Sequence, residues 1–288
     1  MNQNDLRAAT SDSLSLMMEQ ERTIYASFDY LGNKNRDHKE NIVLSNSVGD
    51  LQVKNRDTVC FSGGSLTPSD RTLIVDWCYA IVDECQLDRD GVAVAMNIVD
   101  RFMNNPSSKV ILKLNDRVQY QLVAVTALYI AIKLNEIVAV GSDGFSAISQ
   151  GTYAAEDIEE MERIILYRLS WRLNPPTSLQ VGYQILALLL PNEVTKTLEE
   201  GTYHFLADET KIQVENSVRD NYFTTRWPST IALAAILNAI EQLVNDKDYK
   251  YLLKAVQLML EEFDFCSPMI LLSAKERLRH LMDENVEL

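Results

Sequence analysis

The segment from about Asp116 to Glu136 constrains the fold most strongly, because its stretch "LVAVTALYIAI" has almost no polar side chain on any face. A surface helix shows one apolar stripe, whereas a helix that is apolar all round must be enclosed by other elements. Its longest nearly unbroken apolar run, Val123 to Ile132, is too short to span a bilayer. The segment is therefore predicted to be the central helix of a helical bundle.

Neighbouring segments supply helices that would surround it. The stretch "SDRTLIVDWCYAIVDECQL" repeats its apolar residues at steps of three and four, and a second stripe runs from Val92 to Met103. The acidic start and high helix propensity of "AAEDIEEMERIILYRL" predict another helix. After the break "NPP" (174–176), helices are predicted at about 178–190, 192–209, 228–243, 247–262 and 267–285. No alternating strand pattern appears, so the fold class is all-α, in two halves of roughly five helices each.

The start of the chain has a different composition. Residues 1–62 are polar with short apolar clusters, and "YLGNKNRDHKEN" (30–41) has no helical or strand period. Such a segment buries too little apolar surface to offset the entropy lost on ordering. The predicted organisation is a largely disordered, flexible regulatory tail over residues 1–62, a first helical domain over 63–174 and a second over 175–288.

Charge and composition narrow the range of partners and cofactors. The formal net charge of −14 argues against a nucleic-acid partner, because neutralising phosphates requires a basic surface. The four cysteines form no CxxC pair and the three histidines lie far apart, so neither a metal nor another cofactor is expected. The N-terminus lacks the pattern of a secretory signal. We expect a chain of the nucleus or cytoplasm that does not enter a membrane.

Enzyme signatures are absent from the sequence. It contains no glycine-rich phosphate loop, no HExxH zinc motif and no GxSxG serine motif. Cys78 and Cys85 lie on an apolar stripe with no histidine near them in sequence, which indicates core packing rather than nucleophilic chemistry. The chain is therefore predicted to have no catalytic residues and not to be an enzyme.

One cation interrupts the apolar surface of the central helix. On helical spacing Lys133 shares a face with Ile130, so its amine either reaches water at the helix end or meets an anion. Glu162 has a similar setting, on the stripe that contains Ile165. Spacing alone favours two edge residues that reach water. The alternative is a pair, and removing one partner of a buried pair costs about 3–5 kcal/mol.

Several stretches resemble the cyclins, the regulatory subunits of cyclin-dependent kinases, and most closely the mitotic and S-phase group. In the first half these are, in order, "DRTLIVDWCYAIVDE" (70–84), "AMNIVDRFM" (95–103), "YQLVAVTALYIAIKLNE" (120–136) and "MERIILYRLSWRLNPPT" (161–177). In the second half "RWPSTIALAAI" (226–236) resembles the family's Pro-Ser-x-Ile-Ala-x-Ala-Ala stretch, though more weakly. The likeness covers about residues 65–285.

The resemblance implies two tandem five-helix cyclin boxes that bind and activate a cyclin-dependent serine/threonine kinase and help to select its substrates in cell-cycle control. In this family a lysine and a glutamate at the positions of Lys133 and Glu162 contact the C-helix region of the kinase. The residues Leu134, Leu166 and Trp171 match apolar positions that pack against that kinase helix. The alternative is a cyclin-box scaffold or transcription-factor-like protein that activates no kinase.

Two further sites are implied by the same resemblance. Many cyclins of this group dock Arg-x-Leu peptides of substrates or inhibitors on a hydrophobic patch, which here corresponds to Leu73, Ile74, Trp77, Tyr120 and Gln121. Asp70 and Ala80 depart from the family's pattern, so altered docking is expected. The tripeptide Lys39-Glu40-Asn41 resembles the KEN degron read by the anaphase-promoting complex, with an ordinary polar turn as the alternative.

Overall fold

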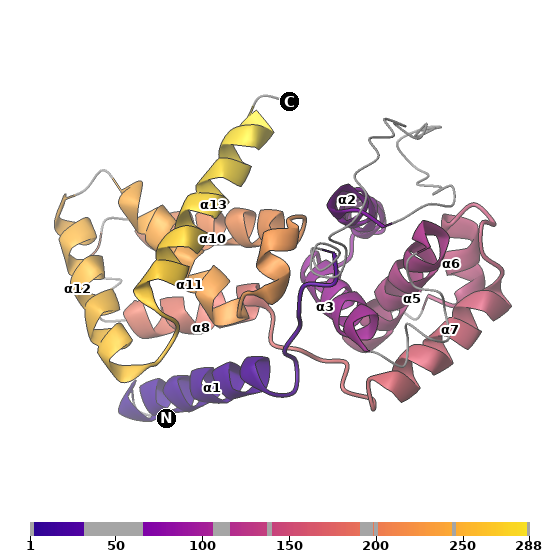
Figure 1. The fold of residues 1–288 in the computed structure, drawn as a ribbon. Coiled ribbons are helices and arrows are strands. Elements are labelled where there is room, and N and C mark those ends of the chain that lie inside the picture. The colour runs from indigo at the N-terminus through magenta and orange to yellow at the C-terminus, as the bar shows by residue number, and fades with distance from the viewer. Residues whose placement is uncertain are drawn as a thin grey trace, which may run out of the picture. The chain divides into compact units, whose positions relative to one another are not determined.

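The computed structural model describes residues 3–31, 66–105, 116–136, 140–190, 198, 201–243 and 246–286. The regular elements within these ranges are all helices, which confirms the all-α prediction (Figure 1). The chain forms two compact units. We call residues 27–174 with 218–225 the first unit, and residues 1–26, 175–217 and 226–288 the second unit.

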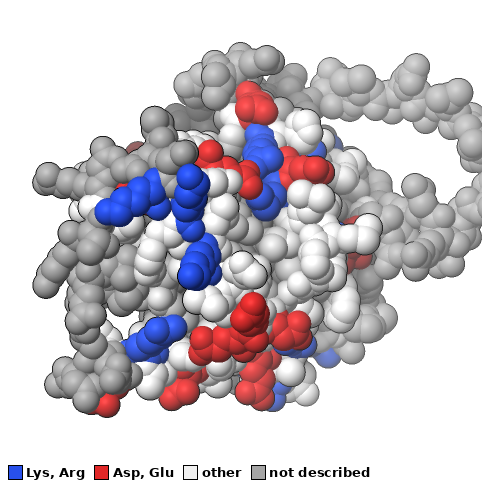
Figure 2. Space-filling view, turned by 90° about the vertical axis from the view of Figure 1, so that its left-hand side faces the viewer, with Lys and Arg blue, Asp and Glu red and all other residues white. Residues whose placement is uncertain are grey.

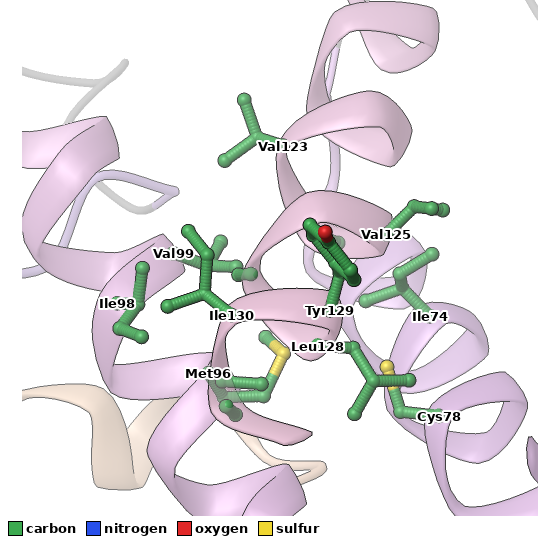
Figure 3. Packing of buried hydrophobic residues seen from close by; sticks show 14 of the residues in the cluster. Ile74, Cys78, Met96, Ile98, Val99, Val123, Val125, Leu128, Tyr129 and Ile130 are labelled. Carbon is green, nitrogen blue, oxygen red and sulfur yellow. The ribbon is translucent and has the colours of Figure 1, made fainter. Parts of the chain in front are cut away.

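The first unit is built around one buried helix. Its helices are α2 (Pro68–Glu84), α3 (Asp90–Asn104), α5 (Arg117–Asn135), α6 (Ser142–Ile148) and α7 (Ala155–Arg168), with a short 3-10 helix, η2 (Asn221–Thr225). Every residue of α5 from Val123 to Ile132 is buried, and α2, α3 and α7 pack against it. Figure 3 shows Met96 and Val99 of α3, and Ile74 and Cys78 of α2, beside the side chains of α5. The prediction of a central helix is confirmed.

The starts of α2 and α5 are held together by one carboxylate. Asp116 caps α5 by accepting the backbone N–H of Val118 at 3.0 Å. Asp70 accepts the backbone N–H of Thr67 at 2.7 Å and so closes the first turn of α2. The same carboxylate accepts from Arg117 Nε at 2.8 Å. Asp70 is completely buried, so both of its oxygens serve the fold.

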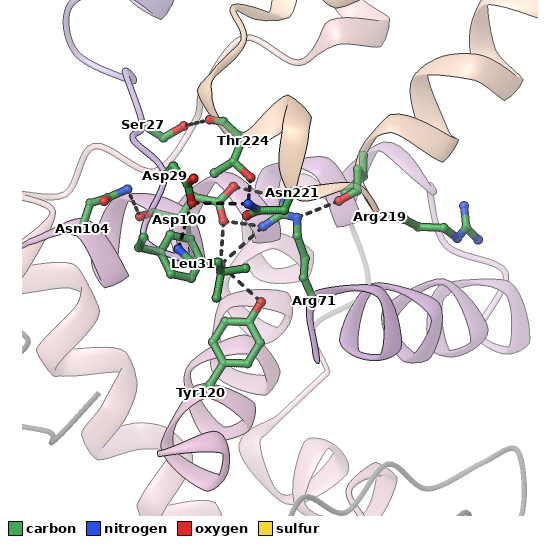
Figure 4. Close-up of polar contacts among 12 residues, drawn as sticks. Ser27, Asp29, Leu31, Arg71, Asp100, Asn104, Tyr120, Arg219, Asn221 and Thr224 are labelled. Carbon is green, nitrogen blue, oxygen red and sulfur yellow. Dashed lines mark hydrogen bonds and ion pairs between the residues drawn. The ribbon is translucent and has the colours of Figure 1, made fainter. Parts of the chain in front are cut away.

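A buried ion pair joins α2 to α3 (Figure 4). The guanidinium of Arg71 donates to both carboxylate oxygens of Asp100, at 2.5 and 3.1 Å. The two side chains are only 4% and 6% exposed. Burial alone lowers the pKa of Arg71, but the neighbouring carboxylate raises it above its ordinary value, so the guanidinium stays charged. Burial raises the pKa of Asp100, and Arg71 opposes that rise. Arg71 Nε donates to the carbonyl of Val218 at 3.0 Å, and the hydroxyl of Tyr30 donates to Asp100 at 3.0 Å. The network therefore gathers four segments of the first unit.

Two short segments far apart in sequence meet beside this network. The hydroxyl of Ser27 donates to the carbonyl of Thr224, and the amide of Asn221 donates to the carboxylate of Asp29 at 3.3 Å. Asn104 of α3 donates to the carbonyl of Phe28 at 2.5 Å. Residues 27–31 and 218–225 are thus parts of the first unit, which differs from the sequence-based assignment of the former to a tail and of the latter to the second domain.

We predict that Arg71→Ala lowers the free energy of unfolding by about 3–5 kcal/mol, because it leaves the Asp100 carboxylate buried without its cation. Arg89→Ala is the control, since Arg89 forms an ion pair with Asp83 at a more exposed position and should cost less than about 1 kcal/mol. Urea unfolding followed by tryptophan fluorescence measures both. Equal losses in the two variants would contradict the importance given to the Arg71–Asp100 pair.

The second unit contains α1 (Gln3–Arg22), α8 (Ser178–Leu189), α10 (Thr202–Ser217), α11 (Pro228–Glu241), α12 (Asp246–Glu262) and α13 (Pro268–Val286). Helix α11 is its central element: most of its residues are buried, and α8, α10 and α13 pack against it. Gly182 of α8 permits close packing there, because a Cβ at this position would lie 3.3 Å from Thr210 Cγ2. The chain leaves the first unit and returns to this unit between Asn174 and Pro175.

The structure differs from the sequence prediction at residues 3–22, which form α1 rather than a disordered segment. Leu14 and Met18, four residues apart on one face, are buried in the core of the second unit. Glu21, three residues further on, continues that face and is 1% exposed. The tail prediction rested on average composition, whereas a helix needs only one apolar stripe to dock.

Glu21 is the buried polar end of the α1 contact. Its carboxylate accepts the backbone N–H of Ser229 at 2.8 Å, and also the Ser229 hydroxyl, at the start of α11. The adjacent Arg22 lies 4.5 Å from the ring centroid of Trp227 and donates to the carbonyl of Phe265. Burial raises the pKa of Glu21 to about 7, although the bonds from Ser229 and the nearby Arg22 oppose that rise.

This raised pKa predicts a pH dependence of stability. The unfolded pKa of 4.5 lies below the folded value of about 7, so the folded chain binds the extra proton and the contribution of Glu21 falls as pH rises between these values. Relative to wild type, Glu21→Gln should gain on the order of 2–3 kcal/mol between pH 5 and pH 8. Glu19→Gln, on the exposed side of the same helix, is the control. Urea unfolding at several pH values measures the difference, and parallel pH profiles for wild type and Glu21→Gln would contradict the prediction.

Candidate functional site

Lys133 and Glu162, which are 29 residues apart, meet on the surface of the first unit. Lys133 Nζ lies 2.7 Å from Glu162 Oε1, and the two side chains are 42% and 15% exposed. The amine also lies 4.7 Å from the ring centroid of Tyr129. The lysine is therefore paired and still reaches solvent, which combines the two alternatives that the sequence left open.

The surroundings of Lys133 favour its charged form. Burial lowers the pKa of Lys133, but the hydrogen bonds to Glu162 and Tyr129 outweigh it and raise the pKa above its ordinary value. The position in the last turn of α5 also favours a cation, because helix carbonyls there carry partial negative charge. An ammonium has three donors, of which Glu162 and Tyr129 engage two, so Lys133 retains one for a partner.

Packing of the two helices fixes where these side chains point. Ile158, Met161 and Ile165 of α7 are buried in the core of the first unit. Glu162 follows Met161 and therefore lies at the edge of that buried face, toward the end of α5. Behind α5, the Glu136 carboxylate accepts the backbone N–H of Asp88 at 2.9 Å and anchors the residue after the helix.

Exposed apolar side chains flank the pair. Leu134 is 49% exposed and Trp171 is 72% exposed, while Leu166 is half-buried. Ser170 and Trp171 both have left-handed backbone angles, with φ of 52° and 62°. The N–H of Trp171 donates to the carbonyl of Leu166 at 3.0 Å, as in the tight turns that end many helices. This turn holds the indole of Trp171 out from the surface.

Sequence reasoning missed Tyr167. It is 75% exposed and lies in the last turn of α7, shortly before the turn that carries Trp171. A shallow groove of about 290 Å³ lies along this helix, lined by Glu160, Arg163, Ile164, Tyr167 and Arg168. The signal in the sequence was an aromatic residue at a position opposite the apolar stripe of the helix.

The residues assigned to a peptide-docking patch do not form an exposed surface. Ile74, Trp77, Tyr120 and Gln121 are all 5% exposed or less, and only Leu73 is partly exposed. These side chains contribute to the core of the first unit, and the peptide-docking patch stays a prediction. The Tyr120 hydroxyl lies 3.3 Å from that of Tyr30, so this side chain takes part in the polar network of the first unit.

The remaining predictions concern a degron, metal ligands, membrane-spanning helices and reactive cysteines. Lys39, Glu40 and Asn41 lie outside the described residues, so the degron stays a prediction. Among the described residues no three His, Cys, Asp or Glu side chains gather as metal ligands would, and no helix there is long and apolar enough to cross a membrane. Burial raises the pKa of the Cys78 thiol to about 12, which keeps it protonated.

Comparison with known proteins gives a consistent family. Residues 44–174 match the model of the cyclin N-terminal domain. The chain is 30% identical over 186 residues to G2/mitotic-specific cyclin-A1 of Caenorhabditis elegans, covering 64% of this chain and 35% of the relative. It is 31% identical over 135 residues to G1/S-specific cyclin-E1 of Gallus gallus, covering 44% of this chain and 32% of the relative. The matched part thus spans about a third of the length of these relatives.

A solved structure shares the fold. The viral cyclin from herpesvirus saimiri aligns with a TM-score of 0.57 at 14% identity, over 77% of this chain and 87% of that one. The relatives include G2/mitotic-specific and G1/S-specific cyclins. From the matched model, we identify residues 44–174 as a cyclin N-terminal domain, and the relatives that the chain resembles over longer stretches are cyclins as well.

Proposed function

We propose that this cyclin binds the catalytic subunit of a cyclin-dependent serine/threonine kinase and activates it in control of the cell cycle. The observation that carries the proposal is the Lys133–Glu162 pair, an ion pair at the surface with exposed Leu134 and Trp171 around it. The relatives named above are cyclins of cell-cycle phases. Kinase activation is what the resemblance to the cyclins implies.

The pair suits the recognition of a partner's backbone. Lys133 has one donor left after its bonds to Glu162 and Tyr129, and Glu162 has a second oxygen, so together they can bind a carbonyl and an N–H group of one peptide segment. Each charge holds the other in position before the partner arrives, which lowers the ordering cost of binding. The proposed segment is at the C-helix of the kinase.

Activation follows from where the cyclin docks. A protein kinase is active when the glutamate of its C-helix pairs with the lysine that holds the ATP phosphates. A partner that binds the inward position of that helix more tightly than the outward one shifts the equilibrium toward the active state. The cyclin supplies binding energy to the kinase and takes part in no bond-making step.

Exposed aromatic residues would supply most of that binding energy. Trp and Tyr dominate the energetics of protein interfaces because they bury a large area with few rotatable bonds. Trp171 and Tyr167 are among the most exposed large side chains of the described residues. We therefore assign the centre of the kinase contact to the surface formed by Lys133, Leu134, Glu162, Leu166 and Trp171.

Replacing Lys133 and Glu162 together by alanine should weaken kinase binding by at least about 30-fold, or 2 kcal/mol, because two hydrogen-bonding charges are lost from the interface. The matched control is Lys211→Ala with Glu215→Ala, an ion pair of the second unit with side chains 46% and 15% exposed. Tagged chain recovered from its own cells identifies the bound kinase, and titration with purified kinase then measures affinity and phosphotransfer. Undiminished binding by the Lys133/Glu162 variant would contradict the assignment of the kinase-binding site.

Trp171→Ala should weaken kinase binding by about 2 kcal/mol or more while leaving the fold intact, because the ring is exposed in the free chain. Tyr203→Ala is the control, since Tyr203 is 40% exposed on α10 of the second unit. The same titration measures both variants. If a kinase binds but its activity does not rise, the chain is a scaffold and the activation half of the proposal fails.

A further inference from the structure

The C-terminal end of α3 is hydrogen-bonded to the end of α7 and to the turn after it. Arg101 Nη1 donates to the carbonyl of Arg172 at 2.7 Å, and the Asn105 amide donates to the carbonyl of Arg168 at 3.5 Å. Both acceptors are backbone groups, so the side chains of Arg168 and Arg172 are not used in these bonds. The segment that carries them therefore lies against the end of α3.

Exposed aromatic side chains surround this junction. Tyr167 and Trp171, in the same segment, are 75% and 72% exposed. Phe28, whose carbonyl accepts from Asn104 at the end of α3, is 68% exposed. Single exposed apolar side chains are ordinary on a protein surface, whereas a group of them marks a site that a partner covers.

Two arginines of this segment have no acidic partner in the described part of the chain. Arg168 is half-buried, with its guanidinium carbon 5.7 Å from the ring centroid of Tyr167, and Arg172 is exposed. Residues 163–174 contain three arginines and no acid, although the whole chain has a formal net charge of −14. Of the three, Arg163 pairs with Glu160.

Unpaired guanidinium groups are not the general condition of this chain. Figure 2 shows charged side chains of both signs on the face that carries α12. Ion pairs with carboxylates are formed by Arg22, Arg71, Arg89, Arg117, Arg163, Arg219 and Arg279. The cations beside the exposed rings thus differ from most other arginines of the structure.

We call Phe28, Tyr167, Arg168, Trp171 and Arg172 the basic-aromatic surface. A guanidinium binds a carboxylate through two parallel N–H bonds and also stacks on aromatic rings. Tyr, Trp and Arg are the residues that most often dominate the energetics of protein interfaces. An acidic peptide segment fits this surface, whereas a nucleic acid, which also stacks on rings, would be repelled by the net charge of the chain.

We propose that the basic-aromatic surface binds an acidic stretch of the kinase beside its C-helix, so that charge helps to select which kinase this chain binds. The inference rests on the proposed function, because Trp171 belongs both to the proposed kinase contact and to this surface. A kinase segment that covers Trp171 would have its neighbouring residues within reach of Arg168 and Arg172. Carboxylates there would supply the partners that this chain does not provide.

The test uses the full chain and the kinase recovered with it from its own cells. The sequence of that kinase should contain Asp or Glu among the residues that flank its C-helix, and a kinase without them overturns the inference. Arg168→Glu with Arg172→Glu should weaken kinase binding at least about tenfold at low salt. The difference should shrink as added salt screens the charges.

The matched control changes the net charge by the same amount elsewhere. Arg7→Glu with Lys254→Glu alters two exposed residues of the second unit and should leave kinase affinity nearly unchanged. Equal affinities of the arginine variant and this control overturn the inference. If the Lys133/Glu162 variant still loses binding in that case, the proposed function stands, whereas failure to recover any kinase contradicts both.

A charge exchange separates a specific contact from a general loss of fold. Changing the flanking acids of the kinase to lysine should weaken its binding to wild type and restore its binding to the Arg168→Glu, Arg172→Glu variant. Absence of this rescue overturns the inference. So does a change in the sedimentation of the chain alone without a change in kinase affinity, which would assign the surface to a contact between two copies.

Discussion

The first unit depends on one buried ion pair, in which neither charged side chain can be removed without destabilising the other. Arg71 and Asp100 are almost completely removed from water, so each charge is tolerable only while the other is in place. The pair ties α2 to α3, and the same two side chains reach Tyr30 and the backbone of Val218. Helix α5, which carries Lys133, packs against both α2 and α3. The surface proposed to bind a kinase is therefore positioned by charges that no partner touches.

Local sequence pattern predicted the elements of this fold where one segment contains all the information. The central place of α5 follows from its lack of any polar face, and the break before Pro175 follows from the prolines themselves. Helix α1 was missed because its buried residues are few among polar neighbours. Only the presence of a receiving surface on the second unit shows that Leu14 and Met18 form a docking face.

The candidate site was predictable in its residue types but not in its contacts. Helical spacing placed Lys133 and Glu162 on apolar faces, yet which two faces meet is decided by the packing of α5 and α7. The polar contact of Tyr120 could not be predicted for a related reason. Tyr120 is apolar over most of its area, but its hydroxyl bonds to a residue ninety positions earlier. Such distant partners leave no periodic signal in the sequence.

The position of Tyr30 shows that the first unit begins before the residues that match the family model. The family match begins at residue 44, whereas the hydrogen-bonded interior of the first unit already includes the hydroxyl of Tyr30 and the buried side chain of Leu31. A boundary drawn from likeness to relatives therefore cuts through a polar core. Loss of the Tyr30 hydroxyl would remove hydrogen-bond partners from Asp100 and Tyr120 inside the matched domain, so the stability of that domain depends on a residue outside it.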